Sequence, residues 1–257
     1  MPEASAPEGS LCKHSPPKPG ASVAVVGAGD YIGSTIARRF AQAGYHVFAG
    51  RRNGEKLAPL VEGIATEGGL CSGLSLDARD EGAVGDFMRQ ADEAAPLEVA
   101  VFNVGANVNF PLLETTERVF RKVWELACYA GFLTGREAAR LMLPHGRGSI
   151  FFTGATASVR GGSGYTAFAG AKFGLRAVAQ SMARELGPQN IHVAHLVIDS
   201  GVDTEWVRQR IVAQGGSLED RVLMNPASIA ETYWQLHQQP RDAWTHELDL
   251  RPGPEIW

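Results

Sequence analysis

Three glycines between an apolar run and an amphipathic run are the residues of this sequence with the clearest chemical use. Residues 23–26 are apolar and mostly β-branched, which is typical of a strand buried on both faces. Gly27, Gly29 and Gly33 follow, and apolar residues then recur every fourth position to residue 40, as on one helix face. Backbone N–H groups at such a helix N-terminus can hold a pyrophosphate, because glycine lets a ligand approach closely. The pattern predicts a phosphate-binding turn, the alternative being glycines that only close a sharp loop.

No residue pattern predicts a metal site. His192 and His195 are three residues apart in the apolar run 191–198, which is expected to be a strand. Their side chains would then point to opposite faces and could not share a metal ion. The three cysteines are scattered without a CxxC spacing, which favours a reducing compartment such as the cytoplasm over a disulfide framework.

The bulk composition favours a protein that handles a small molecule. The 257 residues carry a net charge of −4, which is no reason to expect nucleic acid or a membrane as partner. No run approaches the about 18 apolar residues of a membrane span. Residues 1–21 are rich in Pro, Ser, Gly and Glu and are expected to be a disordered leader. Residues 22–257 are expected to form one domain with a C-terminal tail.

Six or seven apolar runs alternate with helical patterns along the rest of the chain. The expected strands are residues 23–26, 45–49, 70–76, 97–102, 149–153 and 191–198, with 246–250 as a seventh at the sheet edge. The expected helices cover residues 32–40, 57–64, 84–91, 114–143, 165–186 and 226–237. This alternation predicts an α/β fold, a single doubly wound Rossmann-type domain with a mostly parallel sheet flanked by helices.

Two polar positions at strand ends extend the pattern begun by the glycine turn. Asp77 follows the third expected strand, and Asn103 and Gly105 follow the fourth. The order and spacing of these motifs resemble the short-chain dehydrogenase/reductase family over residues 22–250. The resemblance implies that Asp77 contacts adenine and that the segment around Asn103 and Gly105 forms the floor of the cofactor cleft. The alternatives are a helix cap for Asp77 and a turn former for Asn103.

The glycine turn stands where that family has the motif TGxxxGxG. Val26 replaces the threonine and Tyr31 replaces the middle glycine, whose role Gly29 takes over in part. The resemblance implies cofactor contacts from five residues of this turn: Gly27, Gly29, Tyr31, Ile32 and Gly33.

Two further segments determine the cofactor prediction. Arg51 and Arg52 follow the second strand, where a family member selective for NAD would hold an acid against the ribose hydroxyls. Guanidinium groups there can bind a 2′-phosphate, so NADP(H) is expected over NAD(H), unless the pair is only a solvated surface pair. Residues 199–204 occupy the place of the family's PGxVxT. The resemblance implies that Val202 meets the nicotinamide carboxamide and that Thr204 gives a hydroxyl to the cofactor.

The family's catalytic unit is largely replaced in this chain. In the family, a Tyr and a Lys four residues apart on one helix shuttle a proton, with a Ser and an Asn upstream. Lys172 fits this pattern, and the resemblance implies that it also binds the nicotinamide ribose. Phe168, Ala155 and Ala127 stand at the positions of the Tyr, Ser and Asn. A phenylalanine has no proton to give.

Two neighbouring hydroxyls are the candidate replacements. Tyr165 precedes Lys172 by seven residues, on the same side of the helix but about 10 Å away. Thr156 lies next to the lost serine, its alternative role being a turn hydrogen bond. The segments 107–111, 161–165 and 207–223 are expected to line the substrate pocket without one diagnostic charge.

These residues predict an NADP(H)-dependent oxidoreductase that acts on a small carbonyl or alcohol substrate with an atypical proton donor. Lys172, Tyr165 and Thr156 are its expected catalytic residues, and a homodimer or homotetramer is expected from the family. One alternative is a non-catalytic NADP(H)-binding pseudoenzyme, used as a sensor or an assembly subunit. Another is a lyase or isomerase that uses the same pocket without net redox change.

Overall fold

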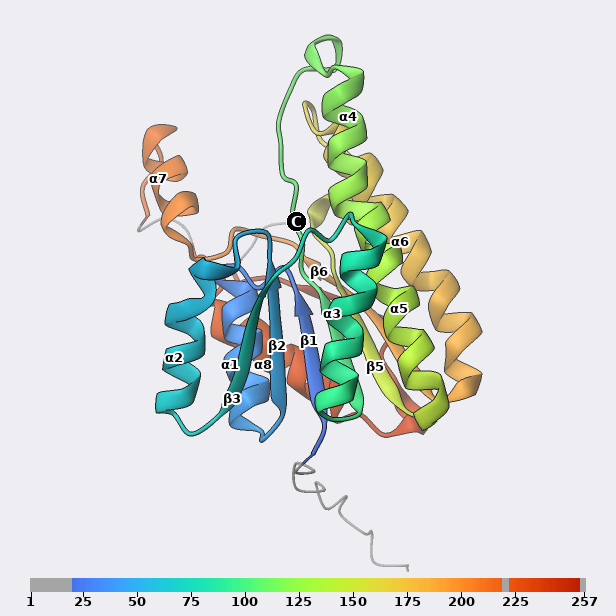
Figure 1. Ribbon diagram of the computed structural model, residues 1–257. Helices are drawn as coiled ribbons and strands as arrows, with labels where there is room; N and C mark the ends of the chain where they lie inside the picture. Colours follow the sequence, from blue (N-terminus) through green and yellow to red (C-terminus); the bar gives the residue numbers. More distant parts are fainter. Residues whose placement is uncertain (1–19, 219–221, 255–257) are drawn as a thin grey trace, which may run out of the picture.

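A seven-stranded parallel sheet forms the middle layer of the protein in the computed structural model, which describes residues 20–218 and 222–254 (Figure 1). The strands are β1 Ser22–Val26, β2 His46–Arg51, β3 Leu70–Ser75, β4 Leu97–Phe102, β5 Gly148–Thr153, β6 Ile191–Ile198 and β7 Glu247–Leu250. Their order is β3-β2-β1-β4-β5-β6-β7, so the order reverses between β1 and β4. Such a reversal opens a crevice at the carboxyl ends of the strands, where α/β proteins bind ligands. The predicted Rossmann-type fold is confirmed, with every strand pair parallel.

Helices cover both faces of the sheet and bury one apolar cluster each (Figure 1). One face carries α1 Ile32–Gln42, α2 Ala58–Thr66 and α8 Pro226–His237, and the other carries α3 Glu81–Ala94, α5 Ala130–His145 and α6 Thr166–Leu186. Alternate residues of β1 point into the two clusters, with Val23 and Val25 on one side and Ala24 and Val26 on the other. Residues 23–26 of this strand are therefore all apolar, as the sequence predicted, because each of them faces one of the two clusters.

The long helix expected over residues 114–143 is interrupted. It consists of α4 Glu117–Trp124, a π-helical segment Glu125–Tyr129 and then α5. The π segment carries Ala127, the residue at the family's asparagine position. Single π turns inside α-helices are frequent at functional sites, because they redirect the side chains around them.

Two segments lie beyond the carboxyl edge of the sheet: α4, and α7 Glu205–Ala213 (Figure 1). The sequence did not predict α7 as a helix, because Ile211 alone is buried along it and no apolar period exists. Thr204 caps α7, its hydroxyl oxygen accepting from Val207 N at 3.1 Å.

The two ends of the chain were also the subject of predictions. The expected leader falls almost wholly outside the described residues, which begin at Gly20. The expected seventh strand is present as β7. Trp244, at the start of the tail, folds back on its own chain and stacks on His192, with ring centroids 4.8 Å apart.

Candidate active site

The glycine turn is built so that side chains are excluded from it. Gly27 has a φ of +91°, and a Cβ there would lie 2.7 Å from the carbonyl oxygen of Asn103. A Cβ on Gly33 would press on the backbone of Gly27 and would lie 2.7 Å from the Cα of Ala28. A Cβ on Gly29 would meet nothing within 4 Å, so the main chain there faces open space. The Asn103 amide holds the turn by donating to the Gly27 carbonyl at 3.0 Å.

A cavity of about 580 Å³ extends from this turn across the ends of β1, β2 and β4. Seven of the predicted cofactor residues line it: Gly27, Gly29, Arg51, Arg52, Asp77, Asn103 and Gly105. Lys56 lines it as well and adds a third cation near the two arginines. Sequence reasoning missed Lys56, although its place four residues after Arg52 was the available signal.

Asp30 and Asp77 are tied to arginines at this cavity. The Arg51 guanidinium contacts the Asp30 carboxylate at 2.6 Å. Arg79 donates to both carboxylate oxygens of Asp77, at 2.9 and 2.6 Å, which lowers the pKa of Asp77. Asp77 does not cap a helix, since Asp80 caps α3 by accepting from Ala83 N at 3.0 Å.

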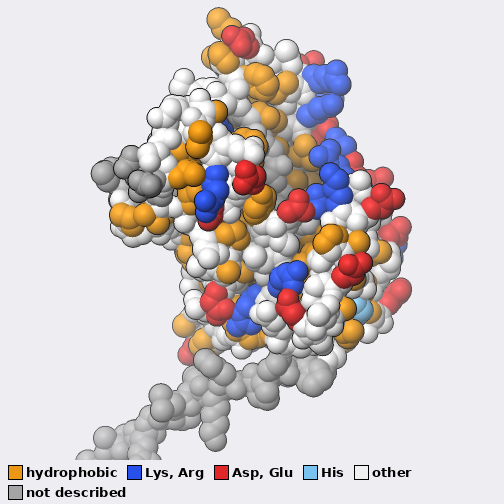
Figure 2. Space-filling model, turned by 90° about the vertical axis from the view of Figure 1, so that its left-hand side faces the viewer, with side chains coloured by type: hydrophobic (Ala, Val, Ile, Leu, Met, Phe, Trp, Pro, Cys, Tyr) orange, Lys and Arg blue, Asp and Glu red, His pale blue; other side chains and the backbone are white. Residues whose placement is uncertain are grey.

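The remaining predicted cofactor residues lie outside this cavity. The Tyr31 hydroxyl points to α7 and accepts from the backbone N of Glu205 at 3.0 Å. Gly33 is buried beneath the turn, and Thr204 is used as the cap of α7. Ile32 and Val202 line a larger neighbouring cavity of about 870 Å³ between the sheet edge and α7. Figure 2, which faces the α7 side, shows this part of the surface hollowed and bordered by hydrophobic side chains.

Lys172 is buried behind the ends of β4 and β5. Its Nζ donates to the Thr153 carbonyl at 2.8 Å and to the Val104 carbonyl at 3.4 Å. Only 3% of the residue is exposed, and this burial lowers the pKa of Lys172 to about 8. The Nζ also lies 6.0 Å from the centre of the Phe168 ring.

The three replaced catalytic positions have become one apolar surface. Ala127 and Phe168 are buried in a cluster with Val123 and Cys128, and Ala155 packs against that cluster. None of the three side chains carries a polar atom. Proton transfer at this site therefore needs a group from another position.

The two candidate hydroxyls border a third cavity of about 370 Å³, together with Ala155 and Phe168. Thr156 donates its proton to the buried carboxylate of Asp199 at 2.5 Å. The Tyr165 hydroxyl accepts from the Arg210 guanidinium at 3.3 Å, an arrangement that leaves its own proton for another acceptor. Tyr165 thus keeps a proton that it can transfer, whereas the proton of Thr156 is already donated to a carboxylate.

The described residues show neither a candidate metal site nor a candidate membrane span. Within residues 20–218 and 222–254, no group of three or more His, Cys, Asp or Glu is placed to hold a metal ion. In the same described ranges, no helix combines the length and the apolar character needed to cross a membrane.

A glycine turn at the point where the strand order of a parallel sheet reverses, with a buried lysine beyond it, defines a Rossmann-type protein. The chain belongs to the short-chain dehydrogenase family: the family model described as short chain dehydrogenase matches residues 21–215. The resemblance inferred from the sequence is confirmed.

Named relatives agree with this assignment. The 3-oxoacyl-[acyl-carrier-protein] reductase MabA of Mycobacterium tuberculosis is 31% identical over 194 residues, which cover 75% of this chain and 74% of MabA. A crystal structure of a short-chain dehydrogenase from Rhodopseudomonas palustris is 63% identical, with a TM-score of 0.79 over 90% of this chain and 98% of that one. A metagenomic short-chain oxidoreductase solved with NADP shares the fold at 23% identity, with a TM-score of 0.78 over 91% and 98% of the two chains.

Proposed function

We propose that the chain is an NADP(H)-dependent oxidoreductase that interconverts a small carbonyl compound and its alcohol, with Tyr165 as the proton donor. One observation carries the proposal. The glycine-turn cavity and the cavity that holds Tyr165 both border the loop after β4, the first at Asn103–Gly105 and the second at Asn107. A dinucleotide held on the turn would therefore extend toward a chamber that contains a proton donor.

The residues of the cleft fit a phosphorylated dinucleotide. The turn around Gly27 and Gly29 leaves the main chain open to phosphate oxygens. Arg51, Arg52 and Lys56 form a basic end where a 2′-phosphate would lie. Asp30 orients Arg51 through one guanidinium nitrogen, which leaves its other donors for the ligand.

The chain's own groups handle the proton. When bound, the reduced cofactor supplies a hydride for the carbonyl carbon, so that the carbonyl oxygen needs one proton to complete the alcohol. Tyr165 gives that proton, and the Arg210 guanidinium stabilises the phenolate that remains until solvent restores it. Lys172 holds the ribose side of the cleft, while Thr156 keeps Asp199 in place. The name of the MabA relative, which describes reduction of an oxo group, supports this class of reaction.

A binding titration followed by turnover tests the proposal. The chain is titrated with NADPH and NADH, and the saturated protein is assayed against a panel of carbonyl compounds by absorbance of the reduced nicotinamide. We expect tighter binding of NADPH, and Arg51→Gln with Arg52→Gln should reduce that preference by about tenfold or more, because charge-assisted hydrogen bonds are lost. Tighter binding of NADH would refute the cofactor assignment. NADPH binding without turnover across the panel would refute the activity.

A specific observation supports one alternative, a non-catalytic NADP(H)-binding protein. Ala127, Ala155 and Phe168 pack as ordinary apolar core, which is the state expected of an abandoned catalytic site. The same titration separates the two functions, since the alternative predicts NADPH binding with no turnover by the native chain. The alternative also predicts that Tyr165→Phe leaves the binding of NADPH unchanged.

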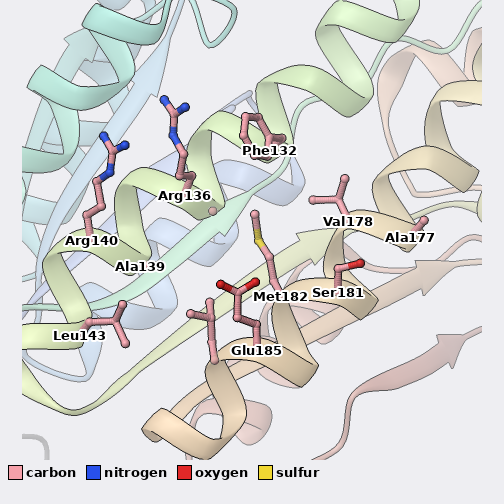
Figure 3. A pocket seen from close by; sticks show the side chains of 12 residues that line it. Phe132, Arg136, Ala139, Arg140, Leu143, Ala177, Val178, Ser181, Met182 and Glu185 are labelled. Carbon is pink, nitrogen blue, oxygen red and sulfur yellow. The ribbon is translucent and has the colours of Figure 1, made fainter.

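A second copy of the chain is the proposed partner. A groove of about 550 Å³ runs between α5 and α6, with an apolar floor that includes Ala139, Val178 and Met182 (Figure 3). Large apolar side chains continue this surface along α4 and α6, where Phe120, Trp124 and Phe173 are each more than 40% exposed. An apolar surface of this extent is typical of a homo-oligomer interface. Sedimentation should show a dimer or tetramer that Ala177→Arg dissociates and the distant Leu113→Arg does not.

A further inference from the structure

The chamber beside the cofactor cleft has an unbalanced charge. It consists of two neighbouring cavities, of about 370 and 870 Å³, which share the side chains of Ala155, Thr156 and Ile198. Arg160 borders the first cavity and Arg210 the second, and the described residues that line them include no aspartate or glutamate. The charge of Arg160 is offset by the buried carboxylate of Asp199, which leaves Arg210 as the positive charge offered to a substrate in this chamber.

The two arginines differ in what they contact. Arg160 donates to the buried carboxylate of Asp199 at 3.2 Å. Arg210 has no carboxylate partner within the described part of the chain; it donates to the Tyr165 hydroxyl at 3.3 Å and lies over the Trp206 ring, 5.3 Å from the ring centre. The hydroxyl of Tyr165 and the ring of Trp206, both neutral, thus orient the Arg210 guanidinium. Its charge remains available to a ligand.

The neighbouring arginine on the same helix shows the ordinary surface arrangement. Arg208 binds both carboxylate oxygens of Asp203, at 2.5 and 2.7 Å, on the exposed side of α7. Arg210 turns instead toward the chamber that Tyr165 and Ala155 border. The charge of Arg208 is therefore neutralised by Asp203 at the surface, whereas the charge of Arg210 faces the cavity proposed to hold the substrate.

We propose that Arg210 and Tyr165 together recognise a 2-oxo acid, or the 2-hydroxy acid in the reverse direction. The inference rests on the proposed function and names its substrate class. The guanidinium binds the substrate carboxylate, and the Tyr165 hydroxyl donates to the neighbouring carbonyl oxygen. The two groups are 3.3 Å apart, a spacing that suits two acceptor oxygens on adjacent carbon atoms. One guanidinium without a carboxylate partner among the described residues matches the single charge of a carboxylate better than a phosphate dianion.

The same assignment accounts for the apolar catalytic positions. A carbonyl beside a carboxyl carbon is electron-poor, so it accepts a hydride more readily than an isolated ketone does. It therefore depends less on the donors lost at Ala155 and Phe168. The carboxylate anchor also fixes the carbonyl carbon near Ala155, where an unanchored ketone would have only apolar contacts.

The first experiment measures kcat/KM with saturating NADPH for unbranched 2-, 3-, 4- and 5-oxo acids and for the amide of each. We expect the 2-oxo acid to be the best substrate and its amide to be about 10- to 100-fold worse, because the charge-assisted contact is lost. Arg210→Gln should raise KM for the 2-oxo acid by a similar factor and leave KM for the amide within about twofold, while kcat falls for both because the Tyr165 phenolate loses its partner. Arg210→Lys should recover part of the loss. Arg208→Gln is the matched control on the same helix and should change nothing.

A binding measurement makes the proposal independent of turnover. Oxamate, an unreactive mimic of a 2-oxo acid, is titrated into the NADPH-saturated protein by calorimetry. We expect binding that Arg210→Gln weakens at least tenfold and Arg208→Gln leaves intact. Oxamate binding without turnover of any oxo acid would refute the proposed reaction while supporting the anion site. Turnover of neutral ketones without oxamate binding would refute the anion site alone. An equal rise of KM for the acids and the amides in Arg210→Gln would refute it as well.

Discussion

Replacing the buried lysine should stabilise the protein at neutral pH while weakening its cofactor site. Burial lowers the pKa of Lys172 from 10.5 to about 8, so the charged form is disfavoured in the folded state by about 3 kcal/mol, at about 1.4 kcal/mol per pKa unit. Lys172→Met removes that penalty. It also leaves the carbonyls of Thr153 and Val104 without their donor, a loss of about 1 kcal/mol for each bond. The net expectation at pH 7 is a variant more stable by about 1 kcal/mol.

The pH dependence distinguishes this reasoning from a general packing effect. The folded pKa is depressed, so the folded state binds fewer protons than the unfolded state between about pH 8 and pH 10.5, and native stability rises with pH in that window. The penalty is fully present below pH 8 and disappears by about pH 10.5. The advantage of Lys172→Met should therefore shrink above pH 8 and reverse, leaving the variant less stable by about 2 kcal/mol.

Urea unfolding from pH 6 to pH 10.5 provides the measurement. The midpoint difference between Lys172→Met and the native chain is compared with that of Lys122→Met, which removes an exposed lysine from α4. The control should show no comparable trend. A Lys172→Met variant that is less stable at pH 7 by the same amount as at pH 10 would refute the argument that burial destabilises the charged lysine. NADPH titration of the same variant should show weaker binding, since Lys172 is proposed to hold the ribose.

Two further predictions concern the replaced residues. Phe168→Tyr combined with Ala155→Ser should restore a proton donor beside Lys172 and increase turnover of unactivated ketones by about 10²-fold or more. Phe173→Tyr, at an exposed position of α6, is the control and should not increase turnover. Unchanged turnover in a double variant that still binds NADPH would contradict the prediction. Tyr31→Phe should remove the hydrogen-bond acceptor for the backbone N of Glu205, so amide hydrogen exchange in α7 should accelerate about fivefold. Exchange in the central strands should not change. Equal protection of α7 in the variant and the native protein would show that this hydrogen bond does not stabilise α7.

Continuous apolar runs made the fold predictable. The predicted bounds of β4 and β6 agree with the structure, because every residue of both strands is buried, including Glu98 and His192 near their starts. The helix Pro226–His237 was also predicted at its observed ends, since Asn225 caps it and a proline occupies its first turn. By contrast, α7 buries only Ile211 and has no period to detect, so it was described only as pocket lining.

The site was predictable only where each residue acts through its own backbone or its near neighbours. The glycine turn and Asn103 are joined by strand pairing and lie where the motif placed them. The direction of Tyr31 was not predictable, because its partner Glu205 is 174 positions away on a helix that the sequence did not reveal. The role of Arg210 was hidden for the same reason.

The altered catalytic positions and Arg210, which has no carboxylate partner among the described residues, together bear on substrate specificity. Loss of a general acid costs about 10²–10⁴-fold in rate, and loss of an oxyanion donor costs a similar factor. A site that has lost both can act only on a substrate that supplies part of the activation, or through a donor placed elsewhere. The Arg210–Tyr165 pair meets both conditions, because it anchors an acid whose carbonyl is already electron-poor and holds a hydroxyl proton beside it. The apolar surface of Ala127, Ala155 and Phe168 would then favour acids over neutral ketones, since a neutral ketone has neither a carboxylate to bind Arg210 nor the usual proton donor at this surface.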